Sequence, residues 1–164
     1  MAELTWERMG RCARLAWEHG VESFENAPRP RSALLTGHLL LGVIRQPECA
    51  GGLMLRRLGI DMALAASITE FELLHARPVP DHAERVVDLW GKPHTPQALR
   101  TMELSLDEAE QFHSAYPIGT EHILLGLLAI PEGMGCRTMA YFGVDYASAR
   151  AARDEIWGLL KLTE

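Results

Sequence analysis

The strongest constraint on the fold is an internal repeat, in which residues 36–65 match residues 120–149 at an offset of 84. The alignment covers thirty positions without a gap, and twelve of them are identical. The identical pairs are Thr36/Thr120, His38/His122, Leu40/Leu124, Leu41/Leu125, Gly42/Gly126, Pro47/Pro131, Glu48/Glu132, Gly51/Gly135, Gly59/Gly143, Asp61/Asp145, Ala63/Ala147 and Ala65/Ala149. Unrelated segments would share only about two identities at average residue frequencies. The repeat therefore predicts two copies of one structural unit, stacked so that each buries apolar surface of the other.

Helical periodicity extends both copies towards the amino terminus. Apolar side chains recur at helical spacing at Met9, Ala13, Ala16 and Trp17, and again at Leu99, Met102, Leu106 and Ala109. Each series predicts an amphipathic helix packed on one face. These helices match at an offset of 89 rather than 84, so the first copy carries about five extra residues. We place them in the loop at 26–31, where two prolines exclude a continuous helix.

Each copy is predicted to form four helices. They cover about 6–22, 37–46, 50–58 and 62–74 in the first copy, and 96–113, 121–129, 134–142 and 146–161 in the second. Capping residues support these bounds: Thr95, Thr36, Thr120, Asp61 and Asp145 at helix starts, and Gly59 and Gly143 at left-handed helix ends. No segment alternates convincingly with period two, so no strands are expected, and residues 82–90 could form a short helix. We expect one all-α domain over 1–164, with repeat one at about 1–75, a linker at about 76–94 and repeat two at about 95–162.

Composition narrows the function. The formal net charge is -6, which disfavours a general binder of nucleic-acid backbones. The amino terminus lacks the pattern of a signal peptide, and the apolar runs are too short to span a bilayer. We therefore expect a cytoplasmic protein with neither nucleic-acid nor membrane partners. The three cysteines, Cys12, Cys49 and Cys136, form no CxxC pair, and we interpret them as small apolar thiols in a reducing compartment.

Three segments of the second copy resemble a known family. They read T-P-Q-A from Thr95, E-L-S-L-D-E-A from Glu103, and G-T-E-H-I-L-L-G-L from Gly119. This pattern resembles the amino-terminal (Clp-N) domain of the Clp unfoldases, and the ClpC branch most of all. The resemblance covers nearly the whole chain in two copies and implies the double four-helix Clp-N fold. It also implies a domain that binds substrates and adaptor proteins without catalysing a reaction.

The resemblance further implies a ligand and two residues that bind it. In ClpC-like members each repeat resembles a receptor for phosphoarginine, and the family's ligand-contacting Thr and Glu match Thr95 and Glu121 here. A carboxylate can pair with a guanidinium, and a helix amino terminus suits a phosphate. The alternative is that Thr95 only caps its helix and Glu121 only complements the helix dipole.

The first copy departs from this pattern. Trp6 stands where the family has the Thr, and Gly37 stands where it has the Glu. Loss of the carboxylate predicts a first site that does not bind this ligand. Trp6 is a candidate protein contact, with burial in the core as the alternative. The paired His38 and His122 lack further ligands at metal-binding spacing, and each is expected to make one local hydrogen bond.

The leading hypothesis is thus a non-catalytic docking module for Clp unfoldase or protease components, adaptors or tagged substrates, without a cofactor. The chain contains no G-x-x-x-x-G-K-[ST] phosphate loop. It is either a free-standing Clp-N protein or the front of a larger one. A second hypothesis is a decoy that sequesters the cyclic peptides that target Clp-N domains. An enzyme is disfavoured because no nucleophile–base or metal constellation appears.

Overall fold

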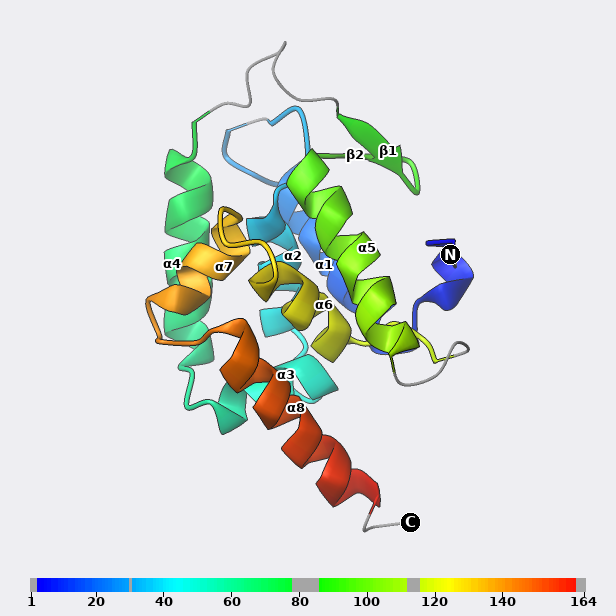
Figure 1. Ribbon diagram of the computed structural model, residues 1–164. Helices are drawn as coiled ribbons and strands as arrows, with labels where there is room; N and C mark the ends of the chain where they lie inside the picture. Colours follow the sequence, from blue (N-terminus) through cyan, green and yellow to red (C-terminus); the bar gives the residue numbers. More distant parts are fainter. Residues whose placement is uncertain (1–2, 30, 78–85, 112–115, 162–164) are drawn as a thin grey trace.

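The computed structural model describes residues 3–29, 31–77, 86–111 and 116–161, with side chains as far as Gly158. These residues form eight α-helices, with a short 3-10 turn near the amino terminus and a small hairpin between the two halves (Figure 1). The elements are η1 (Trp6–Arg8), α1 (Arg11–Glu25), α2 (Thr36–Ile44), α3 (Ala50–Arg57), α4 (Met62–His75), β1 (Val87–Leu89), β2 (Lys92–His94), α5 (Pro96–Glu110), α6 (Thr120–Leu128), α7 (Met134–Ala140) and α8 (Tyr146–Lys161). The predicted all-α fold of two four-helix units is confirmed.

Helices α2 and α6 form the centre of the domain. All nine residues of each helix are buried, which explains why the repeat is most apolar at these positions. The other helices pack around this pair, with α1 and α4 against α2, and α5 and α8 against α6. One glycine in each central helix lets the neighbouring helix approach closely. A Cβ on Gly42 would lie 1.9 Å from the carbonyl oxygen of Ala16, and one on Gly126 would lie 2.5 Å from that of Thr101.

Two threonines join the repeats, and their prediction as caps of their own helices is wrong. Thr36 and Thr120 are the first residues of α2 and α6, after the N-cap residues Leu35 and Gly119. The Thr120 hydroxyl accepts a hydrogen bond of 2.9 Å from the Gly51 N–H in α3. The Thr36 hydroxyl accepts one of 3.2 Å from the Gly135 N–H in α7. Each repeat thus caps a helix of the other one.

The other predicted caps agree with the structure. Asp61 and Asp145 accept hydrogen bonds from backbone N–H groups three residues further on, and Gly59 and Gly143 have φ values of 74° and 71°.

His38 and His122 take the capping role that was predicted for Thr36 and Thr120. His38 Nδ1 accepts from the Leu35 N–H at 3.0 Å, and His122 Nδ1 accepts from the Gly119 N–H at 2.9 Å. The expected local hydrogen bond is present at both positions.

Two predictions about secondary structure need correction. The first helix begins at Arg11 rather than at residue 6, because η1 replaces its first turn. A two-stranded hairpin pairs Val87 with His94, where a short helix or loop was expected; residues 82–85 of that segment lie outside the described residues. Its turn places Trp90 and Gly91 at φ values of 54° and 75°, the two left-handed residues of a tight hairpin turn.

The cysteines are also not all free thiols. Cys12 and Cys49 form a disulfide that connects the first turn of α1 to the N-cap of α3, and only Cys136 is reduced. The two cysteines are separated by 37 positions in sequence, so spacing alone gave no sign of the bond.

Candidate functional site

The amino termini of α1 and α5 each contact the opposite repeat. The Gly10 N–H donates to the Ile118 carbonyl at 2.9 Å, and the Ile118 N–H donates to the Arg8 carbonyl at 2.7 Å. This contact brings the start of α1 beside the start of α6. We call the region formed by Arg8, Gly10, Ile118 and Glu121 the Glu121 junction.

The equivalent contact lies at the start of α5. The Leu34 N–H donates to the Pro93 carbonyl at 2.8 Å, and the Thr95 N–H donates to the Leu34 carbonyl at 3.0 Å. The start of α5 therefore adjoins the start of α2. We call the region formed by Leu34, Gly37, Pro93 and Thr95 the Thr95 junction.

The predicted pair Thr95 and Glu121 is therefore not brought together. Helices α5 and α6 pack along their length and run antiparallel (Figure 1). Thr95 is the N-cap of α5 and Glu121 lies in the first turn of α6, so the antiparallel course places them at opposite ends of the pair. At about 1.5 Å per residue, the fifteen residues of α5 alone span roughly 22 Å. A single repeat-two pocket that holds both side chains is not formed.

Thr95 is buried and its hydroxyl is already engaged. It accepts from the Ala98 N–H at 3.3 Å and donates to the Leu34 carbonyl at 3.2 Å. At the same junction, a Cβ on Gly37 would lie 2.4 Å from the Met134 sulfur and 3.1 Å from a methyl group of Leu73. The place of the family's glutamate is therefore filled by apolar side chains, and Thr95 has no carboxylate beside it on Gly37.

Glu121 is an acid that is buried without an arginine partner. It is 4% exposed, and among the described residues the one basic side chain within 4 Å of its carboxylate is His122, whose Nδ1 lies at 3.5 Å. Burial lowers the pKa of His122 to about 4, so that imidazole is neutral near pH 7. Burial also raises the pKa of Glu121, opposed by its own backbone N–H and by the more distant charge of Arg153. A cation that reached this carboxylate would offset the cost of its burial.

The start of α1 in the same junction is an uncapped helix amino terminus. Its N-cap residue is Gly10, which has no side chain to accept from the helix. Among the described residues, nothing accepts a hydrogen bond from the N–H groups of Arg11, Cys12 and Ala13. Such groups, with the positive end of the helix dipole, bind anions. Arg8 lies beside them and donates to the Tyr116 carbonyl at 3.4 Å.

Asp107, Glu108 and Glu110 form an acidic run near the end of α5, and their side chains differ in exposure. Asp107 is exposed, but Glu108 is buried and accepts from Arg153 at 3.1 Å and from the Tyr146 hydroxyl. Glu110 is partly buried and pairs with Arg8 at 3.3 Å. The repeat alignment gave no sign of the Arg153–Glu108 pair, because Thr69 stands at the position of Arg153 in the first copy.

Trp6 lies in a cluster of aromatic rings. Its ring centroid is 5.3 Å from that of Trp17 and 5.2 Å from that of Trp90, both in edge-to-face geometry, and Arg14 lies over its face. The Trp17 indole N–H donates to His94 at 3.3 Å. These contacts favour packing as the main role of Trp6. Because its side chain is only partly buried, a protein contact through its exposed part stays a prediction.

Comparison with known proteins agrees with this geometry. The Clp repeat (R) N-terminal domain matches residues 93–161. The chain contains a Clp-N domain. It is 34% identical over 121 residues to the ATP-dependent Clp protease ATP-binding subunit ClpC of Staphylococcus saprophyticus, and 35% identical to that of Staphylococcus aureus. These alignments cover 71% of the chain and 13% of each ClpC protein, so the chain spans a small part of its curated relatives.

Two solved structures share the fold. The N-terminal domain of the chaperone ClpD from Arabidopsis thaliana matches with a TM-score of 0.69 and 21% identity over the full length of both chains. A chain from a study of the ATPase ClpV and the TssB–TssC sheath matches with a TM-score of 0.64 and 14% identity, covering 95% of this chain and 94% of that one. At these identities the similarity establishes the fold alone.

Two negative findings complete the description. Among the described residues there is no cluster of three or more His, Cys, Asp or Glu side chains that could hold a metal ion. Within the same part of the chain, no helix is both long and apolar enough to cross a membrane.

Proposed function

We propose that this Clp-N domain is a non-catalytic docking module that binds a phosphoarginine mark on proteins at the Glu121 junction. The observation that carries the proposal is the buried Glu121 carboxylate without an arginine partner, close to an uncapped helix amino terminus. The carboxylate suits the guanidinium of the ligand, and the free N–H groups of α1 with Arg8 suit its phosphate. The partners would be marked substrates, adaptors or components of a Clp machine.

Thr95 remains a predicted ligand contact of a separate, weaker site. Its hydroxyl could donate to a phosphate only by leaving the Leu34 carbonyl. A guanidinium would also find no carboxylate on Gly37. We therefore expect one tight phosphoarginine site per chain, at the Glu121 junction.

Calorimetry with free phosphoarginine tests this proposal. Wild type should bind one equivalent, and Glu121→Gln should weaken binding at least tenfold because it removes the charge but keeps the shape. The matched control Glu103→Gln changes a half-exposed glutamate on α5 and should bind like wild type. Thr95→Ala should also retain binding. Equal affinity of wild type and Glu121→Gln, or loss of binding in Thr95→Ala alone, would refute the assignment.

The cyclic-peptide decoy gains no support from the described residues. Of the three positions at which target domains carry aromatic or basic side chains, Ala2 lies outside the described residues and Leu99 is partly buried. The third, His94, is fully buried against Trp17. A thermal-shift screen with such peptides would identify this function, because a tight ligand raises the melting temperature.

A further inference from the structure

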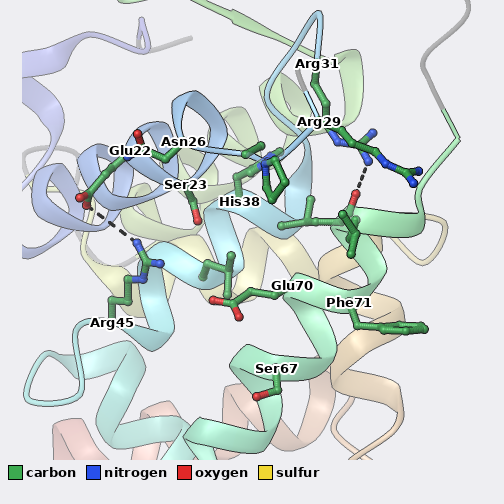
Figure 2. A pocket seen from close by; sticks show the side chains of 15 residues that line it. Glu22, Ser23, Asn26, Arg29, Arg31, His38, Arg45, Ser67, Glu70 and Phe71 are labelled. Carbon is green, nitrogen blue, oxygen red and sulfur yellow. Dashed lines mark hydrogen bonds and ion pairs between the residues drawn. The ribbon is translucent and has the colours of Figure 1, made fainter.

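Residues 26–29 and Arg31 of the loop in the first copy help to form a groove of about 510 Å³, which adjoins the Thr95 junction through Leu73. The groove lies between the end of α1, the loop that follows it, α2 and α4 (Figure 2). This volume lies in the range of ligand-binding clefts. Arg31 holds the loop in place, because its guanidinium donates to the carbonyls of Leu73 and Ala76 at the end of α4.

Repeat two has aromatic side chains where repeat one has the groove residue Leu73 and the nearby loop residue Ser32. At the offset of 84, Leu73 corresponds to Trp157 and Ser32 corresponds to Tyr116. The Trp157 and Tyr116 rings pack edge-to-face with centroids 5.4 Å apart. The first copy has a smaller side chain at both positions, so the volume of two rings is missing beside α4. The walls that remain are apolar, with Leu41 and Leu73 buried and Leu74 exposed.

The apolar side of the groove continues onto the surface of α4. Leu64, Phe71 and Leu74 follow one face of this helix and are 50%, 62% and 38% exposed. These are three of the five large hydrophobic side chains that the described residues expose, so the stripe is concentrated rather than scattered. An exposed apolar stripe beside a cleft is typical of a surface that binds another molecule.

Cationic side chains surround the groove in an acidic protein. Three arginines and two glutamates line it, whereas the chain as a whole carries a net charge of -6. Figure 2 shows Arg29 and Arg31 together on the loop, Arg45 with Glu22 on the other side, and Glu70 between them. Arg29 is exposed and makes no ion pair among the described residues. The positive charge of Arg31 also contributes, after burial, to the lowered pKa of His38 in the groove wall.

We propose that this groove binds a protein segment with one aromatic side chain flanked by acidic residues. The aromatic ring takes the place that Trp157 occupies in repeat two and packs on Leu41, Leu73 and Leu74. The flanking carboxylates pair with Arg29 on one side and Arg45 on the other. Glu70 accepts the indole N–H or phenol O–H, a partner that buried Trp and Tyr side chains generally find.

Fluorescence polarisation with a defined peptide tests this site. The probe is fluorescein-labelled Gly-Asp-Trp-Asp-Leu with an amidated carboxyl terminus, together with one control peptide that has Lys in place of both Asp residues and another that has Ala in place of Trp. The full-length chain should bind the probe in a saturable manner and bind each control at least tenfold more weakly. Absence of saturable binding, or equal binding of the Lys peptide, would overturn the proposal.

Variants locate the binding to the groove. Arg29→Glu and Arg45→Glu change exposed side chains and should each weaken binding at least fivefold. Arg100→Glu, an exposed arginine on α5, is the matched control and should bind like wild type. Leu73→Trp restores the residue of repeat two, fills the groove and should abolish binding while the circular dichroism spectrum stays helical. Unchanged binding in both Arg29→Glu and Arg45→Glu would place the peptide elsewhere and overturn the assignment.

A second copy of the chain is the other candidate occupant. Sedimentation velocity at increasing protein concentration should show the same species for wild type and Arg29→Glu. A wild-type dimer that Arg29→Glu converts to monomer would assign the groove to self-association and overturn the peptide proposal.

Discussion

Thr120→Val tests the way in which the two repeats cap each other's helices. Valine nearly matches threonine in shape, so the change removes the hydroxyl without creating a cavity. It leaves the buried Gly51 N–H without its acceptor at 2.9 Å, because both Thr120 and Gly51 lie in the core. An unsatisfied buried donor costs about 1–3 kcal/mol. Thr36→Val removes the equivalent bond to Gly135 and should have a similar effect.

Urea denaturation followed by circular dichroism measures this loss. With a denaturant slope of about 2 kcal/mol per molar urea, the midpoint should decrease by about 0.5–1.5 M while the slope stays constant. Thr138→Val is the matched control, since Thr138 is 0% exposed and its hydroxyl has no hydrogen-bond partner among the described residues. That variant should be neutral or slightly stabilising. If Thr120→Val left the midpoint unchanged, or if Thr138→Val lowered it equally, the swapped caps would not stabilise the fold.

Two further predictions follow from buried histidines and from the disulfide. Burial and the charge of Arg31 lower the pKa of His38 to about 4, and burial and the charge of Arg153 lower that of His122 to about 4. Below pH 6.5 the unfolded chain therefore binds more protons than the native chain. The free energy of unfolding should therefore decrease by about 2 kcal/mol per histidine between pH 7 and pH 5, and urea midpoints that stay level across that range would contradict this. Reduction of the Cys12–Cys49 bond opens a loop of 37 residues and should cost about 4 kcal/mol by loop entropy. Thiol titration of the unfolded chain should find one free cysteine before reduction and three after it.

Local sequence signals predicted the helices well, because a cap or a helix end depends on neighbouring residues. Asp61 and Gly59 are examples, since each acts within three residues of its own position in the chain. The shortened first helix was missed because Trp6 and Arg8 fit helical periodicity as well as a 3-10 turn. The hairpin was missed because strands of three residues are too short to show period-two alternation.

The candidate site was predicted only in part, because its arrangement depends on contacts between the repeats. Thr95 and Glu121 lie in the same repeat, and nothing in the sequence indicates that each helix start adjoins the other repeat. The backbone contact between Gly10 and Ile118 decides this arrangement, and backbone groups carry no sequence signature. The groove of repeat one was detectable in principle, since the alignment places Leu73 opposite Trp157 and shows the extra residues of the loop.

The central claim is that ligand binding occurs where α1 meets α6 rather than within repeat two alone. Nuclear magnetic resonance with a ¹⁵N-labelled chain and free phosphoarginine tests it most directly. The amide resonances of Gly10, Arg11 and Glu121 should shift during the titration, while those of Gly37 and Ala98 stay in place. Shifts confined to the start of α5, or no shifts at any amide, would contradict the account.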